Sequence, residues 1–265
     1  MLKDDLGLKA NKKRVEPALT DLKKVKRIKF ANWILNNFDK TKTLRILFSD
    51  EKYFDLDGMY NRQNDRIWAV DRAEADANGG IKQKQQFPGK FMVWLGACSK
   101  GITPLVISEN GTMNHQRYID EVLPIPKKYD DKQFGDDWTY QQDGARPHTD
   151  KHSMKWCYDN MPAIIDKQRW PPNSPDLNPL DYSVWTEFVQ QINWNVVRSK
   201  QTLIEELKRC VKKIRPETVL KSCESWTNRL HRLKKLTETI FINKDTWFCR
   251  EFQEESNKKK IKSIG

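Results

Sequence analysis

The run FMVWLGACSKGITPLVIS, residues 91–108, most restricts how this chain can fold. It predicts two strands joined at Lys100 and Gly101, and the first strand is almost entirely apolar, as expected of a strand buried in a sheet. Before it, LRILFSDEKYFDLDG (44–58) is a β-like run that ends at Asp-Gly, and RIWAV (66–70) is predicted as its partner strand. We therefore expect a group of adjacent strands at the start of the fold.

Helices and strands are predicted to alternate after this group. The expected elements are a helix at 114–125 ended by Pro124 and Pro126, a strand at 138–144, a helix at 149–161 and a strand at 163–170 interrupted by Pro171. This order predicts an α/β fold with a mixed sheet flanked by helices.

The two ends of the chain are predicted to be helical and basic. Thr20 is a candidate N-cap for the first helix, and residues 202–205 read as a Thr-x-x-Glu capping box. Pro216 is expected in the first turn of a later helix, whose apolar stripe is Val219, Leu220, Cys223, Trp226, Leu230 and Leu233. We divide the chain into a basic linker and helix (1–43), an α/β domain (44–197) and a basic helical C-terminal extension (198–265).

Charge is distributed unevenly along the 265 residues, which carry 48 Lys and Arg against 36 Asp and Glu. Residues 1–45 have a net charge of +8 and residues 198–265 of +9, whereas residues 46–197 have −5. Basic arms around an acidic centre indicate a polyanionic partner near a site that needs carboxylates, although solvated Lys/Arg-rich helices would give the same pattern.

No apolar run approaches the about 18–20 residues of a membrane span, so no membrane contact is expected. Five cysteines without a CxxC pair fit a reduced intracellular compartment.

Three aspartates stand at the predicted ends of strands or the start of a helix. Asp50 ends the apolar run LRILF, Asp143 follows WTYQQ, and Asp181 follows Asn178 and Pro179, a natural N-cap and first-turn pair. Brought together, such carboxylates repel one another unless cations neutralise them, and Mg²⁺ suits oxygen ligands and phosphate substrates best. The alternative is three unrelated surface acids, since Asp181 also suits the first turn of a helix without any metal.

The sequence around these aspartates resembles a known family. FSDEKYF, QQDGARPHT and WPPNSPDLNPLDYSVW are similar to the three catalytic blocks of the mariner-type transposases of the Tc/mariner superfamily, and the resemblance extends from about residue 20 to about residue 195. It implies an RNase H-like fold in which Asp50, Asp143 and Asp181 form a DDE/D triad that binds two Mg²⁺ ions, for which Mn²⁺ can substitute. One ion would be shared by Asp50 and Asp143 and the other by Asp50 and Asp181.

The resemblance also implies a function and partners. Enzymes of this family excise an element by phosphodiester hydrolysis at its terminal inverted repeats and join the 3′ ends to target DNA, usually at TA, so we expect double-stranded DNA as partner, a homodimer on paired DNA ends and a nuclear location. The 37 residues between Asp143 and Asp181 resemble the maT subgroup. Family members carry paired helix-turn-helix modules before the catalytic domain, and the chain is expected to be truncated ahead of LGLKANKKRVEPALT.

Other residues have weaker signals. Lys12, Lys13 and Arg14, together with Arg146 and His148, are candidates for contacts with DNA, and His148 is also expected near the second aspartate. A zinc site at His148, His152 and Cys157 lacks a fourth ligand. Glu51 is expected on the face of the strand opposite Asp50 and is left out of the triad.

Two alternative functions remain open from the sequence. One is an inactive or domesticated transposase-derived protein that binds DNA or another partner without cutting. The other is an RNase H-like nuclease acting on RNA hybrids, which the SPDLNP block disfavours.

Overall fold

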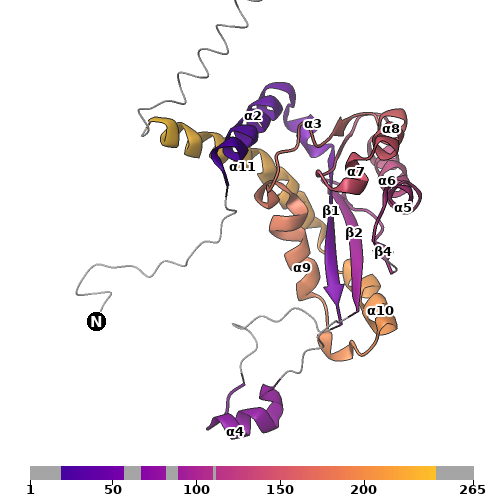
Figure 1. Ribbon diagram of the computed structural model, residues 1–265, viewed down its shortest axis with the longest axis vertical. Coiled ribbons are helices and arrows are strands. Elements are labelled where there is room, and N and C mark those ends of the chain that lie inside the picture. Colours follow the sequence, from indigo (N-terminus) through magenta and orange to yellow (C-terminus); the bar gives the residue numbers. More distant parts are fainter. Residues whose placement is uncertain (1–18, 57–66, 82–88, 110–111, 243–265) are drawn as a thin grey trace, which may run out of the picture.

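The computed structural model describes residues 19–56, 67–81, 89–109 and 112–242, and within them a mixed sheet forms the centre of the fold (Figure 1). Its strands are β1 (Ile46–Asp55), β2 (Lys90–Cys98), β3 (Gly101–Ile102), β4 (Val106–Ser108), β5 (Thr139–Gln141) and β6 (Ile164–Ile165). The strand order is β3-β2-β1-β5-β6, and β4 pairs with β2. β1 is antiparallel to β2 and parallel to β5, and β5 is parallel to β6. The predicted mixed α/β sheet is confirmed.

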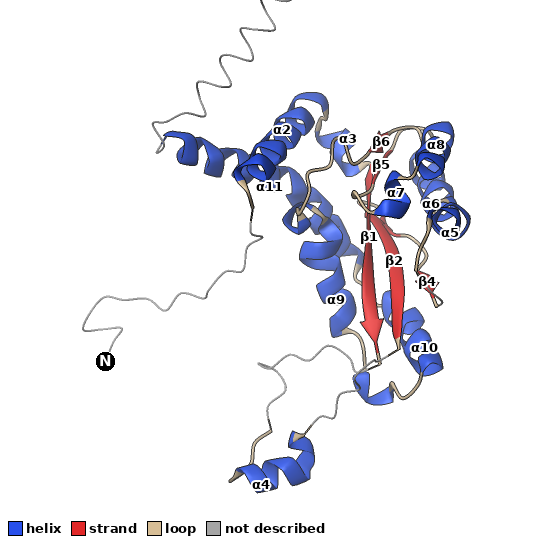
Figure 2. Cartoon of the chain, viewed as in Figure 1, coloured by secondary structure: helices blue, strands red, loops and turns tan. Residues whose placement is uncertain are grey.

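The helices lie on both sides of the two long strands (Figure 2). They are α2 (Asp21–Asn37), α3 (Lys40–Leu44), α4 (Arg72–Ala75), η1 (Asp76–Gly80), α5 (His115–Arg117), η2 (Tyr118–Val122), α6 (Pro124–Phe134), α7 (Arg146–Thr149), α8 (Lys151–Asn160), η3 (Pro175–Leu177), η4 (Leu180–Val184), α9 (Trp185–Gln190), η5 (Trp194–Val196), α10 (Lys200–Val211) and α11 (Pro216–Ile242). None of them, within the described residues, combines the length and apolarity needed to cross a membrane.

Strand β2 is apolar along its whole length because both of its faces are covered. Successive side chains of a strand point to opposite faces. Phe91, Val93, Leu95 and Ala97 pack against α9 and α10, whereas Met92, Trp94 and Cys98 pack against residues of η2, α8 and β5. The apolar run at 91–98 therefore marks the centre of the sheet, as predicted.

A third apolar cluster joins the two ends of the chain to the sheet. Phe30 and Ile34 of α2, Phe48 of β1, and Trp226 and Leu230 of α11 are all buried in it. Thr20 caps α2, as predicted, by accepting a hydrogen bond from the backbone N–H of Lys23. The helices predicted to lie outside the α/β domain thus complete its hydrophobic core.

The first half of the chain differs from the prediction in two places. Residues 67–70 form no strand, and β1 pairs with β2 instead. Trp68 and Val70 are 95% and 94% exposed, so this short apolar run has no surface to pack against. The helix predicted at 114–125 ends at Val122, close to Pro124 as expected, but Pro124 begins a further helix, α6, that was not predicted. In the first turn of α6 the missing N–H of Pro124 costs no hydrogen bond.

Smaller corrections concern the second half. The predicted strand at 163–170 is only β6, two residues long. The capping box of α10 is formed by Ser199 and Thr202, three residues earlier than expected. α11 begins at Pro216 as predicted, but Leu220 is 38% exposed and does not belong to the buried stripe.

Candidate metal centre

Asp50 lies in β1, and Asp143 lies two residues after the end of β5, the strand parallel to β1. In the pairing of β1 with β5, Phe48 lies opposite Gln141. Asp50 follows Phe48 by two residues within β1, and Asp143 follows Gln141, the last residue of β5, by two residues. Both residues therefore lie near the carboxyl end of β5, which is where open α/β sheets commonly bind ligands.

Asp181 is brought to the same place by the start of helix η4. The side chain of Asn178 accepts a hydrogen bond from the backbone N–H of Leu180 at 3.0 Å, which confirms the predicted cap. Its amide nitrogen donates to the carbonyl oxygen of Ser49 at 2.9 Å. The beginning of the helix is thus fixed against β1 one residue before Asp50.

The three aspartates line one pocket of about 650 Å³. Its wall also contains Lys26, Lys167 and residues 170–175, which form the proline-rich segment before η3. Arg27 of α2 holds this segment in place: its guanidinium donates to both oxygens of Asp176, at 2.8 and 2.5 Å, and to the hydroxyl of Ser174. This proline-rich segment therefore forms one side of the pocket.

The negative charges of Asp50 and Asp181 are poorly neutralised by other groups of the protein. Burial, followed by the charge of Asp181, raises the pKa of Asp50 to about 8. Burial also raises the pKa of Asp181 to about 6, although Lys52 and a hydrogen bond with Asp50 act against it. Carboxyl groups with raised pKa values in one pocket are the arrangement that a bound cation stabilises. Because the donors are carboxylate oxygens, the pocket fits Mg²⁺ or Mn²⁺ better than a metal that prefers sulfur or nitrogen.

Asp143 has a different environment. Burial alone would raise its pKa, but hydrogen bonds from the His148 ring (2.7 Å) and from the backbone N–H of Ala145 (2.9 Å) outweigh burial, and the pKa is lowered. The other ring nitrogen of His148 lies 3.1 Å from Oε1 of Glu51. Burial would lower the pKa of His148, but the charges of Glu51 and Asp143 raise it to about 10. A charged imidazolium therefore holds Asp143 ionised and in a fixed orientation.

The chain is similar in sequence to known transposases. No family model matches the chain. The Tcb2 transposase of Caenorhabditis briggsae is 25% identical over 181 residues, which are 67% of this chain and 63% of that protein. The Tc3 transposase of Caenorhabditis elegans is 29% identical over 177 residues, which are 66% of this chain and 49% of that protein. The chain is thus similar in sequence to transposases of the Tc elements.

Solved structures of Mos1 mariner transposase share the fold. The catalytic domain of Mos1 superposes with a TM-score of 0.60 at 16% identity, covering 84% of this chain and 97% of that one. The Mos1 paired-end complex with Mg gives a TM-score of 0.71 at 16% identity, covering 88% of this chain and 68% of that one. The predicted RNase H-like fold is confirmed. The chain spans between about a third and two thirds of the length of the curated relatives it matches.

Two residues that position the aspartates were not predicted from the sequence. Trp185 is 2% exposed and donates its indole N–H to Oδ2 of Asp50 at 2.6 Å. It stands four residues after Asp181, so the helical spacing was the signal that could have placed it on the same side of the helix. Glu51 was excluded from the triad, and its contact with His148 was not foreseen.

The residues predicted to contact DNA are placed differently from one another. Arg146 is exposed at the first position of α7. His148 lies beside Asp143 as expected, but its side chain is 3% exposed and both ring nitrogens face carboxylates, which leaves neither for a phosphate. Lys12, Lys13 and Arg14 lie outside the described residues.

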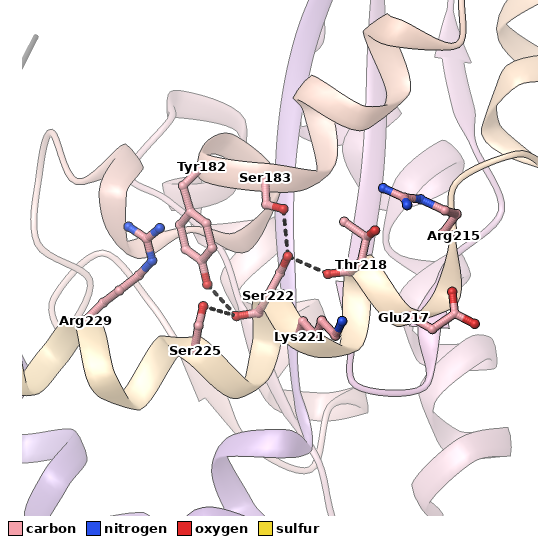
Figure 3. A pocket seen from close by; sticks show the side chains of 9 residues that line it. All are labelled: Tyr182, Ser183, Arg215, Glu217, Thr218, Lys221, Ser222, Ser225 and Arg229. Atoms are coloured by element: carbon pink, nitrogen blue, oxygen red, sulfur yellow. Dashed lines mark hydrogen bonds between the residues drawn. The ribbon is translucent and has the colours of Figure 1, made fainter. Parts of the chain in front are cut away.

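A second pocket, of about 420 Å³, lies between η4 and α11 (Figure 3). Tyr182 donates its hydroxyl to the carbonyl oxygen of Ser222 at 2.7 Å, and the hydroxyl of Ser222 donates to that of Ser183 at 2.8 Å. The guanidinium of Arg229 stacks over the ring of Tyr182 at 3.6 Å. These contacts fix the two residues after Asp181 to the C-terminal helix, so α11 contributes to the position of the third aspartate.

Proposed function

We propose that this chain is the catalytic part of a cut-and-paste DNA transposase, which hydrolyses phosphodiesters at transposon ends and joins them to target DNA at TA sites. The observation that carries the proposal is the gathering of three carboxylates in one pocket, where burial and mutual repulsion raise two of their pKa values. The relationship to transposases and the basic flanks of the chain support DNA as the substrate.

Asp50, Asp143 and Asp181 are the proposed metal ligands. Asp50 would contribute to both of two divalent ions, Asp143 to one and Asp181 to the other. When bound, such a pair of ions activates the attacking oxygen and stabilises the departing oxygen of a phosphodiester. Structures of Mos1 with Mg and with Mn support the choice of these metals.

The other residues of the site orient these ligands and receive the substrate. Trp185 fixes Asp50, the imidazolium of His148 fixes Asp143, and the Asn178 cap fixes Asp181. Lys26 and Lys167 on the pocket wall would meet the phosphates of a DNA strand. Arg146, Lys12, Lys13 and Arg14 are proposed as further backbone contacts.

The assembly and location belong to the same proposal. Terminal inverted repeats and target DNA are the proposed partners, bound by a homodimer in the nucleus. The Mos1 paired-end complex with the left transposon end supports binding to DNA ends. The measured mass of the DNA-bound complex in solution would separate one copy of the chain from two.

A metal-dependent nicking assay tests the enzymatic part. The purified chain is incubated with supercoiled plasmid and Mg²⁺ or Mn²⁺, and nicked products and joined strands are counted. We expect activity that chelation abolishes and that Asp143→Asn lowers by orders of magnitude. Asp159→Asn is the matched control, because Asp159 is an exposed acid on α8 outside the pocket, and it should leave activity unchanged.

Two results would contradict the proposal. Cleavage that persists in Asp143→Asn or in chelator would show that the three aspartates are not the catalytic centre. DNA binding without cleavage in either metal would favour the non-cutting, domesticated alternative.

A further inference from the structure

A second group of metal-binding side chains lies outside the carboxylate pocket. His115 is the first residue of α5, Asp150 is the N-cap of α8, and His152 is the second residue of α8. Each offers one ligand atom, and these atoms all lie within 4.8 Å of one another. We propose that His115, Asp150 and His152 form a separate zinc site that joins α5 to α8.

The position of Asp150 is set by the local structure of the helix start. Its Oδ1 accepts hydrogen bonds from the backbone N–H of His152 at 2.9 Å and lies 3.0 Å from the Nδ1 of the same residue. The N-cap therefore fixes the carboxylate without using its second oxygen. That second oxygen, Oδ2, faces Nδ1 of His115.

The distance between these two atoms is compatible with a shared metal ion. Nδ1 of His115 and Oδ2 of Asp150 are 3.8 Å apart, which is too long for a direct hydrogen bond. Two ligands of one tetrahedral zinc, each about 2.0–2.1 Å from the metal, lie about 3.3 Å apart. A displacement of either ligand atom by a fraction of an ångström, through rotation of its half-exposed side chain, gives this separation.

The two histidines already face each other. Their rings are stacked with centroids 5.2 Å apart and an angle of 23° between the planes. N-capping explains the contact between Asp150 and His152, but it gives no reason for His115 to approach them from another helix. A shared metal ion explains all three positions.

The donor set selects the metal. Two imidazole nitrogens and one carboxylate suit Zn²⁺, whereas the carboxylate-only pocket suits Mg²⁺ or Mn²⁺. The side chains of His115, Asp150 and His152 are 41%, 32% and 57% exposed, which leaves room for water as a fourth ligand. The site described earlier and this one would therefore bind different ions.

A metal here would brace the structure behind Asp143. α5 contacts both α7 and α8, and the helical run that begins with α5 continues into Tyr118, whose ring packs on His148 at 4.4 Å between centroids. Tyr118 also donates its hydroxyl to Gln142, the residue before Asp143. Joining α5 to α8 would restrict this layer and, through it, the orientation of His148.

The test measures zinc binding by the full chain with the carboxylate pocket disabled by Asp50→Asn, Asp143→Asn and Asp181→Asn together. Titration calorimetry with ZnCl₂ is expected to show one zinc per chain, and His115→Ala or His152→Ala should each weaken binding by roughly tenfold or more. His231→Ala is the matched control, because His231 is an exposed histidine on α11, and it should leave the affinity unchanged.

A second variant separates ligand loss from loss of the helix cap. Asp150→Ser retains a good N-cap but removes the carboxylate, so zinc binding should fall while the circular dichroism spectrum stays the same. With Co²⁺ in place of Zn²⁺, the visible absorption of a tetrahedral site should be present in the parent chain and absent from His152→Ala. Absence of zinc binding, or an affinity that neither histidine substitution changes, would overturn the proposal.

Discussion

The side-chain amide of Asn178 donates a hydrogen bond to the carbonyl oxygen of Ser49, and both residues are buried. The same side chain accepts the backbone N–H of Leu180. One residue therefore connects the strand that carries Asp50 with the helix that carries Asp181. The distance between these two aspartates depends on a side chain that is itself no candidate ligand.

Replacing Asn178 should separate the two aspartates. Asn178→Ala leaves the Ser49 carbonyl and the Leu180 N–H without their partner, and we expect a loss of about 1–3 kcal/mol in the free energy of unfolding. Metal-dependent nicking should fall more than the lost stability explains, because the ligands no longer share one geometry. Urea denaturation and the plasmid nicking assay measure the two effects.

Asn178→Ser provides the control for this prediction. Serine keeps the cap of the helix but is too short to reach Ser49, so roughly 1 kcal/mol of stability should return while nicking stays low. Full recovery of nicking in the serine variant would mean that the cap alone matters.

Trp185→Phe should change metal binding by Asp50 without leaving a large cavity in the core. Phenylalanine keeps the ring that packs near Phe54 and Phe188 but removes the N–H that hydrogen-bonds Asp50. That bond lowers the pKa of Asp50, so its loss should raise the pKa further. We expect the Mn²⁺ concentration for half-maximal nicking to rise by roughly tenfold and the pH profile to move to higher pH.

Trp194→Phe is the matched substitution for comparison. Trp194 packs at the edge of the same apolar cluster, but no hydrogen bond links it to an aspartate among the described residues. If both tryptophan variants shift the metal requirement equally, the effect comes from packing and not from the bond to Asp50.

The sequence was informative wherever the signal is local. The apolar run of β2, the caps of α2 and η4, and the first turn of α11 depend on neighbouring residues, and the structure confirms them. The three aspartates were singled out because they follow such local signals, and the structure brings them to one pocket. Their role as metal ligands remains a prediction.

The remaining features depend on contacts between distant parts of the chain. The hydrogen bond from Trp185 to Asp50 spans 135 residues, and the contact between His148 and Glu51 spans 97. No periodicity or spacing encodes which residues meet across such intervals. The misread strand at 67–70 has the same cause, since a short apolar run becomes a strand only where a partner edge is free.

The raised pKa of Asp50 predicts how the metal-free protein responds to pH. A carboxyl group has a pKa near 3.8 in the unfolded chain, whereas Asp50 has about 8 in the folded protein, so folding favours the protonated form. This group therefore lowers the free energy of unfolding as pH rises from about 4 to about 8. In chelator at pH 8, Asp50→Asn should melt several degrees above the parent, since 1 kcal/mol shifts Tm by about 2–4 °C in a chain of this size.

The same experiment contains its own checks. The difference in Tm should be smallest below pH 4, where Asp50 becomes protonated in both states. Mg²⁺ should raise the Tm of the parent at pH 8 but have little effect on Asp50→Asn. Equal pH slopes for the two proteins would contradict the assigned environment of Asp50.

The ion pair of Arg27 with Asp176 predicts that α2 stabilises the pocket wall. The Arg27 side chain is 4% exposed and Asp176 is 42% exposed, so Asp176→Asn leaves a nearly buried guanidinium without its counter-charge. Fully buried pairs lose about 3–5 kcal/mol when one partner is removed, and we expect about 2 kcal/mol here because Asp176 remains accessible to water. A double-mutant cycle with Arg27→Met should show coupling, since the second substitution removes the unpaired charge.

Asp137→Asn breaks the exposed pair with Arg45 and should change the free energy of unfolding by less than about 1 kcal/mol. Equal losses in Asp176→Asn and Asp137→Asn would mean that α2 does not depend on this contact to hold the proline-rich segment beside the three aspartates.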